Sequence, residues 1–255
     1  MTAFPSPVLI LGARSDIARA LARHYVAEGC EVILGARDAA RLAPDVADLT
    51  VRGRAAVTAV EFDVLADDPD GFFARLGRVP GTVVMVAGLL GDQAASMADD
   101  ATGRLVMETN YVGPARYLLA AARAMRAQGH GQGEGKSRGG CLIGVSSVAG
   151  ERGRGSNFIY GSAKAGFTAL LSGLRNSLLA DGIAVMTVKP GFVRTAMTAG
   201  MALPPALTAS ADQVAQAILA AQRRGRDVVY AKPVWRPIMA VIRAVPESVF
   251  KRLSL

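Results

Sequence analysis

Short apolar runs alternate with longer helical patterns along the whole chain of 255 residues, and this alternation limits the possible folds more than any other feature. Strands separated by helices usually form a parallel sheet covered by helices on both faces. No shift in composition and no internal repeat marks a second unit, so we predict one Rossmann-type domain over residues 1–255, with about seven parallel strands. The expected strands are 7–11, 31–34, 57–62, 82–87, 141–145, 184–188 and 228–231, and the expected helices are 17–28, 39–49, 69–76, 102–127, 158–180 and 211–223.

Composition agrees with such a fold and points to a reducing compartment. Half of the residues are apolar (51%), which is enough for a sizeable core. The two cysteines, Cys30 and Cys141, are too few for a disulfide framework, and we expect both to be buried as small hydrophobic residues. We see no secretory signal pattern and no apolar run of about 18 residues, so the expected location is the cytoplasm.

The first strand leads into a glycine turn at Gly12. A dinucleotide site needs a tight turn here, because the N-terminus of the next helix must face the pyrophosphate. Asp16 and Ala18 stand where the second and third glycines are usual. Asp16 is suited to capping the helix, and its carboxylate near a pyrophosphate counts against the site. A plain strand-to-helix turn therefore stays open as an alternative.

Two arginines accompany this turn. The second strand ends in Gly35-Ala36-Arg37, where enzymes that prefer NAD place an acidic side chain for the ribose hydroxyls. Arg37 and Arg14 could clamp a 2′-phosphate, which favours NADP, or they could be ordinary surface arginines. Asp63 follows the third strand, where it could accept a hydrogen bond from the adenine amino group or cap the strand end.

A tyrosine and a lysine form the candidate catalytic pair. Tyr160 and Lys164 are four residues apart in a predicted helix, so they share one face. An ammonium near a phenol stabilises the phenolate, lowers the phenol pKa and allows general acid–base chemistry. Ser147 lies 13 residues earlier, at the carboxyl end of a strand, where open parallel sheets bind ligands. Asn110 lies in the preceding long helix, and Lys189-Pro190-Gly191 follows the sixth strand.

In the order and approximate spacing of these residues, the chain resembles the short-chain dehydrogenases/reductases over nearly its full length. The resemblance implies hydride transfer, without a metal, between NADP(H) and a carbonyl or secondary alcohol. It implies that Tyr160 exchanges the proton with the substrate oxygen and that Ser147 hydrogen-bonds that oxygen. Lys164 would lower the pKa of Tyr160 and hold the nicotinamide ribose, and Asn110 would position a water that relays protons to Lys164.

The resemblance also implies a set of cofactor contacts. The family usually shows Asn-Asn-Ala-Gly after the fourth strand, whereas this chain has Met85-Val86-Ala87-Gly88, which puts the usual strand-to-strand hydrogen bonds in doubt. The backbone at 192–193 and the Thr195 hydroxyl should hold the nicotinamide carboxamide. The full expected set is Gly12, Arg14, Ser15, Asp16, Ile17, Arg37, Asp63, Val64, Ala87, Gly88, Tyr160, Lys164, Pro190, Gly191, Val193 and Thr195.

The substrate is less constrained than the chemistry. The segment 86–92 resembles one found in reductases of decaprenylphosphoryl-2-keto-erythro-pentose, a keto-sugar on a lipid carrier at the membrane face. The alternatives are a generic ketone, a keto-lipid or a 3-oxoacyl substrate, or a non-catalytic NADP-binding sensor or scaffold. We expect the Met- and Ala-rich segment 195–208 to be an apolar lid over the substrate.

The C-terminal segment 233–255 is basic and amphipathic. Residues 222–255 hold eight cations and two acids, which is +6 of the net charge of +8. Pro237 suits the first turn of a helix and Pro246 would divide the segment into two helices. A basic amphipathic helix can lie at a membrane, which would place the protein peripherally at the inner membrane face. It could instead pack on its own domain, close the pocket or form a contact in a homo-oligomer (a dimer or tetramer), and no nucleic-acid motif accompanies the charge.

Overall fold

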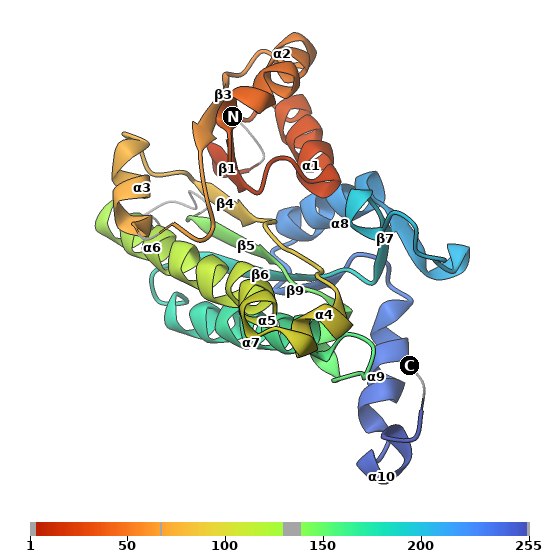
Figure 1. The fold of residues 1–255 in the computed structure, drawn as a ribbon. Coiled ribbons are helices and arrows are strands. Elements are labelled where there is room, and N and C mark those ends of the chain that lie inside the picture. The colour runs from red at the N-terminus through yellow and green to blue at the C-terminus, as the bar shows by residue number, and fades with distance from the viewer. Residues whose placement is uncertain (1–3, 67, 130–138, 254–255) are drawn as a thin grey trace.

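The computed structural model describes residues 4–66, 68–129 and 139–253, and it is built around one parallel sheet (Figure 1). The sheet has seven strands in the order β3-β2-β1-β4-β5-β6-β9, and all neighbouring strands run parallel. The predicted Rossmann-type sheet is therefore confirmed. The strands are β1 (Val8–Leu11), β2 (Val32–Ala36), β3 (Val57–Glu61), β4 (Thr82–Met85), β5 (Cys141–Val145), β6 (Ala184–Lys189) and β9 (Val228–Tyr230).

The central strands send side chains alternately into two apolar layers. In β1, Val8 and Ile10 belong to the cluster on one face, and Leu9 and Leu11 belong to the cluster on the other. All four side chains are fully buried. A strand that is covered on both faces needs apolar side chains at every position, which is why the sequence shows continuous apolar runs.

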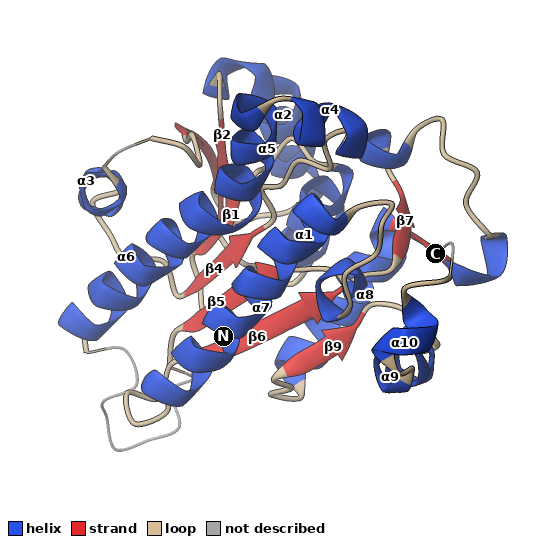
Figure 2. Ribbon diagram, turned by 60° about the horizontal axis from the view of Figure 1, so that its bottom comes forward, coloured by secondary structure: helices blue, strands red, loops and turns tan. Residues whose placement is uncertain are grey.

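Helices cover both faces of the sheet (Figures 1 and 2). One face packs against α1 (Asp16–Ala27), α2 (Ala43–Arg52) and α8 (Ala211–Arg223). The other packs against α3 (Pro69–Arg75), α6 (Gly113–Ala127) and α7 (Phe158–Ser177). The strand order reverses between β1 and β4, and the segments that follow these two strands lead to helices on opposite faces of the sheet, which leaves room for a ligand at their carboxyl ends.

The long helix predicted over 102–127 is interrupted, which corrects that prediction. The structure has α5 (Asp100–Met107), then a π-helical turn over Glu108–Val112, then α6. Asn110 lies in this turn, and its amide Nδ2 donates to the carbonyl of Val106 over 2.8 Å. That carbonyl would accept the backbone N–H of Asn110 in a regular α-helix, so the side chain satisfies a carbonyl that the wider turn releases.

Several short elements were not expected from the sequence. They are α4 (Gln93–Ala98), the 3₁₀ turns at Val148–Glu151, Ala196–Thr198 and Pro205–Leu207, and a separate two-stranded sheet of β7 (Phe192–Arg194) and β8 (Thr208–Ser210). Each is too short for a periodic pattern to identify. The Gly-rich stretch 128–140, which we expected to be a loop, lies mostly outside the described residues.

The C-terminal segment forms two helices, α9 (Trp235–Ala244) and α10 (Glu247–Phe250), with Pro246 at their junction as predicted. They project from one end of the molecule (Figure 1). Trp235, Met239 and Phe250 are nonetheless buried, so much of the apolar stripe packs on the chain's own domain. None of the helices in the described residues is both long and apolar enough to cross a membrane.

Candidate active site

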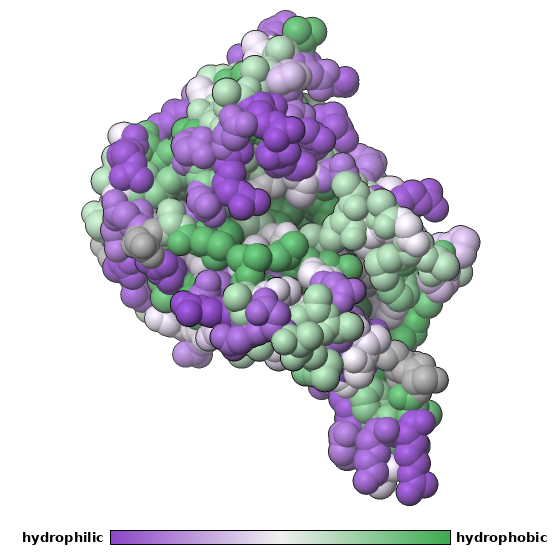
Figure 3. All heavy atoms as spheres, viewed as in Figure 1, coloured by the Kyte–Doolittle hydropathy of each residue, from purple (hydrophilic) through white to green (hydrophobic). Residues whose placement is uncertain are grey.

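A cavity of about 750 Å³ opens where the strands of the main sheet end. In the space-filling view, apolar side chains gather in the hollow at the centre of this face, between more polar surfaces (Figure 3). All sixteen residues expected to contact the cofactor line this cavity, and so does Ser147. The tertiary structure thus brings together segments from six loops that are far apart in the sequence.

The turn after β1 has the geometry that the sequence analysis required. Gly12 has φ +94°, and a Cβ there would lie 2.6 Å from the backbone nitrogen of Ala87, so only glycine fits. The amides of Val86 and Ala87 donate to the Leu11 carbonyl over 2.9 and 3.1 Å. Backbone hydrogen bonds therefore hold β1 to the segment after β4, where the family's asparagine is missing.

The expectation that Asp16 caps α1 is wrong. Ser15 is the N-cap, and its hydroxyl accepts a hydrogen bond from the Ala18 amide over 3.1 Å. The Asp16 carboxylate turns away and accepts from the Ala196 amide over 2.7 Å. The first turn of α1 keeps its orientation toward the cavity, and Asp16 instead ties it to the segment 195–208.

Arg14 and Arg37 both line the cavity, and both are exposed. Asp38, the acid that directly follows Arg37 in the sequence, does not line the cavity. Its backbone N–H and that of Ala39 donate to the Glu61 carboxylate at the end of β3, over 2.8 and 2.9 Å. These two hydrogen bonds lower the pKa of Glu61 and keep its charge on the loop backbone.

Asp63 lies on the cavity wall after β3 and also holds its own loop. Its carboxylate accepts from the Leu65 amide over 3.0 Å, and its carbonyl accepts from the Tyr117 hydroxyl over 2.9 Å. Both predicted roles, a strand-end cap and a cavity-lining acceptor, are therefore compatible with its position.

Tyr160, Ser147 and Lys164 meet at one wall of the cavity. The Lys164 ammonium lies 5.7 Å from the centre of the Tyr160 ring and donates to the Val145 carbonyl over 3.1 Å. Burial raises the pKa of Tyr160 to about 12, and a hydrogen bond with Ser147 opposes that rise. Burial also lowers the pKa of Lys164 to about 8. The phenol pKa moves opposite to our expectation, because removal from water disfavours the phenolate more than its neighbours favour it.

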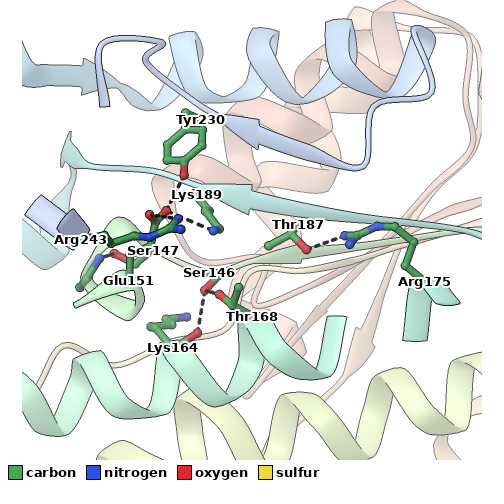
Figure 4. Close-up of polar contacts among 11 residues, drawn as sticks. Ser146, Ser147, Glu151, Lys164, Thr168, Arg175, Thr187, Lys189, Tyr230 and Arg243 are labelled. Carbon is green, nitrogen blue, oxygen red and sulfur yellow. Dashed lines mark hydrogen bonds and ion pairs between the residues drawn. The ribbon is translucent and has the colours of Figure 1, made fainter. Parts of the chain in front are cut away.

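Ser146 holds the helix α7, which carries Tyr160 and Lys164, in place, and the sequence analysis missed this role. Its hydroxyl lies 2.6 Å from Thr168 Oγ1 and donates to the Lys164 carbonyl over 3.0 Å (Figure 4). A Cβ at Gly150 would lie 2.6 Å from the Ala165 amide, so the turn after β5 lies directly against α7. The signal in the sequence that could have indicated this role is the pair Ser146-Ser147 followed closely by Gly150.

Asn110 is the one predicted site residue that does not line the cavity. It is fully buried, its Nδ2 donates to the Leu89 carbonyl over 2.6 Å, and its Oδ1 accepts from the Leu89 amide over 3.2 Å. A Cβ at Gly88 would lie 3.0 Å from Asn110 Oδ1 and 3.5 Å from Lys164 Nζ. Because Gly88 has no side chain, its backbone can lie close to both the Asn110 amide and the Lys164 ammonium.

The segment 195–208 is held at both ends. Ala196 is bound by Asp16, and the Leu207 carbonyl accepts from the Trp235 indole over 3.0 Å. Met197 and Met201 line the cavity and remain about half exposed (46% and 48%). Trp235, whose ring occupies the space that a side chain at Gly191 would need, lines the cavity too. Its place in an amphipathic pattern gave no sign of this contact.

A buried carboxylate connects the C-terminal helices to the turn after β5. The Glu151 side chain is 4% exposed and faces Tyr230, Lys189 and Arg243 (Figure 4). The Tyr230 hydroxyl donates to it over 2.7 Å, and the Lys189 and Arg243 cations lie 3.1 and 3.6 Å away. Burial raises the pKa of Tyr230 to about 12, with a further contribution from Glu151. The charge network fixes α9 beside the cavity.

Comparison with known proteins agrees with this geometry. Residues 6–204 match the family model described as short chain dehydrogenase. An uncharacterized oxidoreductase of Mycobacterium tuberculosis is 38% identical over 255 residues, with 97% of each chain covered. The 3-oxoacyl-[acyl-carrier-protein] reductase of Escherichia coli is 30% identical over 192 residues, with 74% of each chain covered. A short chain dehydrogenase from Burkholderia cenocepacia, solved in complex with NADP, has a TM-score of 0.80 at 22% identity, with 100% of both chains covered. The chain therefore belongs to the short-chain dehydrogenase family.

Proposed function

We propose that this oxidoreductase uses NADPH to reduce a carbonyl group, with Tyr160 as the proton donor. The observation that carries the proposal is the convergence of Tyr160, Ser147 and Lys164 on a cavity that Arg14 and Arg37, from the loops after β1 and β2, also line. A cavity of about 750 Å³ is within the usual size range of small-molecule and cofactor sites.

The protonation states of the catalytic residues favour reduction. A phenol with a pKa of about 12 is protonated at neutral pH, which is the form that can donate a proton to a developing alkoxide. Ser147 donates a second hydrogen bond to the same oxygen and so stabilises its negative charge. Lys164, with a pKa of about 8, is largely charged at neutral pH and adds a positive charge beside the phenol. The bound nicotinamide would supply the hydride.

The cofactor preference follows from the charges near the adenosine end. The first turn of α1 and Gly12 would face the pyrophosphate, and Gly88 would adjoin the ribose. Arg14 and Arg37 would bind the 2′-phosphate, while the neighbouring acid Asp38 lies off the cavity. An arginine pair with no cavity-lining acid at the end of β2 favours NADPH over NADH.

Replacing Tyr160 with Phe tests the enzyme against the sensor or scaffold alternative. Loss of the proton donor should lower kcat for ketone reduction by about 10³-fold, within the range for general acid catalysis. NADPH binding should stay within about twofold, because the ring is kept. Steady-state rates with NADPH and a panel of ketones measure kcat, and fluorescence titration measures the affinity for NADPH. Tyr111→Phe, outside the cavity lining, is the matched control, and equal activity of Y160F and wild type would refute the assignment.

Titration with NADPH and NADH tests the arginine pair. Wild type should bind NADPH at least about tenfold tighter than NADH, since charge-assisted hydrogen bonds to phosphate contribute about 1.5–3 kcal/mol. Arg37→Ala should remove most of that difference and leave NADH affinity unchanged. Arg41→Ala, four residues on and outside the cavity lining, should change neither constant. Equal affinities in wild type would contradict the proposal.

The remaining expectations extend the same proposal. A keto-sugar on a lipid carrier stays one candidate substrate, and a generic ketone, keto-lipid or 3-oxoacyl thioester stays the alternative.

A lid over the substrate at 195–208 is supported by Met197 and Met201, which line the cavity while half exposed. A homo-oligomer is supported by apolar side chains that stay exposed within one short stretch and do not line the cavity, namely Met107, Tyr111 and Val112.

A further inference from the structure

We propose that Arg154 binds an oxyanion on the substrate, a carboxylate or a phosphate, beside the carbonyl that is reduced. This inference rests on the proposed function, because it takes the wall formed by Ser147 and Tyr160 as the place where the carbonyl lies. It narrows the substrate class from any ketone to a ketone that carries a negative charge.

Arg154 has the right position for such a role. It lies between Ser147 and Tyr160 in the chain, on the turn that precedes α7, and it lines the same cavity. Its carbonyl accepts from the Asn157 amide over 3.1 Å, and Asn157 lines the cavity as well. Ser147 and Tyr160, which would hold the substrate carbonyl, therefore flank the segment that carries Arg154.

The Arg154 guanidinium has no protein partner in the part of the chain that the structure describes. Its Nε is buried and makes no hydrogen bond there, and no acid among the described residues contributes to its electrostatics. Burial lowers its pKa, with no neighbouring acid to offset the change. A buried donor without an acceptor is costly, so a ligand that supplies an oxygen at this place is stabilised.

Arg152, two residues earlier, shows what a structural arginine looks like in the same turn. It pairs with Glu247 over 2.6 Å, donates to the Arg243 carbonyl and lies 4.1 Å above the Phe250 ring. Its charge and its hydrogen bonds are used within the fold. The contrast between the two side chains shows that lack of a partner is a property of Arg154 and not of the turn.

The other charged side chains that line the cavity have partners of their own or lie on other loops. Asp16 and Asp63 each accept a backbone N–H. Lys164 donates to a backbone carbonyl, and Arg14 and Arg37 lie on the side of the β1 and β2 loops. Much of the remaining wall is apolar, including Leu89, Leu90, Leu105, Met201 and Trp235. An ion pair in such surroundings is stronger than one in open water.

The test compares charged and neutral ketones that are otherwise alike. One series is 4-oxopentanoate and its longer-chain homologues, each against its methyl ester; a second pair is dihydroxyacetone phosphate against dihydroxyacetone. At the best chain length, wild type with NADPH should show a kcat/KM about 10- to 100-fold higher for the anion, as expected for a charge-assisted hydrogen bond. The two series separate a carboxylate from a phosphate as the preferred group.

Variants of Arg154 complete the test. Arg154→Gln should lower kcat/KM for the anion by the same factor, mainly through KM, and leave the ester within about twofold. Arg154→Lys should recover part of the loss, which a merely structural role would not predict. Equal kcat/KM for anion and ester in wild type, or equal losses on both in R154Q, would overturn the proposal while leaving carbonyl reduction intact.

A binding measurement separates this proposal from the proposed function. Trp235 is the only tryptophan of the chain and lines the cavity, so its fluorescence should change when the keto acids or keto-phosphate bind. If no ketone is reduced but the anions change the fluorescence in wild type and not in R154Q, the anion site stands and the reductase function fails. If the anions are neither reduced nor bound, the anion site is refuted.

Discussion

At the scale of single residues, burial decides the chemistry of the candidate catalytic pair. Tyr160 and Lys164 share a helix face as their spacing predicts, but both are withdrawn from water, which raises the phenol pKa and lowers the ammonium pKa. The two shifts leave Tyr160 protonated and Lys164 partly charged just above neutrality. Reduction should therefore depend on pH through the lysine and not through the tyrosine.

The pH profile of the free enzyme tests this assignment. Below pH of about 8 Lys164 carries its proton, so kcat/KM for ketone reduction should be level there. Above that pH the ammonium loses its charge and kcat/KM should fall about tenfold per unit, whereas alcohol oxidation, which needs the phenolate, should rise. The measurement is initial rates from pH 6 to 10 in both directions. Lys164→Arg keeps the charge and should shift the fall to higher pH; reduction that rises above pH 8 would contradict the model of proton donation by Tyr160.

At the scale of elements, the C-terminal helix α9 helps to form the cavity. Trp235 at its start packs over Gly191 and donates to the Leu207 carbonyl, and Arg243 near its end faces the buried Glu151. One helix therefore contacts the loop after β6, the far end of the segment 195–208 and the turn after β5. Of the roles left open for the segment 233–255, packing on its own domain beside the pocket is the one that these contacts support.

Two substitutions at Trp235 separate packing from hydrogen bonding. Trp235→Ala should lower the free energy of unfolding by about 3 kcal/mol, as expected when a large buried aromatic side chain is truncated. Trp235→Phe keeps most of the packing and loses the hydrogen bond to Leu207, so it should cost about 1 kcal/mol and raise KM for the ketone more than it changes kcat. Urea unfolding followed by circular dichroism and steady-state kinetics are the measurements. Stability of W235A equal to wild type would show that α9 is not packed as described.

At the scale of the whole molecule, the basic charge of residues 222–255 is only partly used within the fold. Arg223 pairs with Glu28, Arg243 faces Glu151, and Lys232 donates to the Thr208 carbonyl. Arg236, Lys251 and Arg252 are all exposed. In contrast, Trp235, Met239 and Phe250 are buried. Charge is thus available to a membrane surface, but much of the apolar stripe is not.

Vesicle sedimentation distinguishes membrane binding by the exposed cations from membrane insertion of the apolar side chains. The full chain should bind vesicles with 30% phosphatidylglycerol weakly at low salt, since each exposed cation adds about 1 kcal/mol near an anionic surface. Binding should disappear at 0.5 M NaCl and with neutral phosphatidylcholine vesicles, because apolar insertion is absent. Arg236→Glu together with Lys251→Glu should abolish it at low salt. Binding that persists in high salt would mean that α9 and α10 leave the domain and insert.

Much of the fold could be predicted because its signals are local. The seven apolar runs became the seven strands, since a strand buried on both faces requires apolar residues at consecutive positions. The π-helical turn at Asn110 could not be predicted, because its cause is not a helix pattern. It depends on hydrogen bonds from the Asn110 side chain to Val106 and to Leu89, 21 residues earlier.

The sequence by itself determined the order of the strands along the chain, the glycine turn at Gly12 and the grouping of Ser147, Tyr160 and Lys164, because each depends on residues that are near one another in the chain. Only the tertiary structure decided that Asp16 binds Ala196, that Trp235 lines the cavity and that, among the described residues, the Arg154 guanidinium has no partner while that of Arg152 has three. Contacts of this kind join residues from distant elements, or depend on which groups fail to meet. Burial and the absence of a counter-charge are properties of three-dimensional surroundings, and they set the pKa values and the ligand chemistry of this cavity.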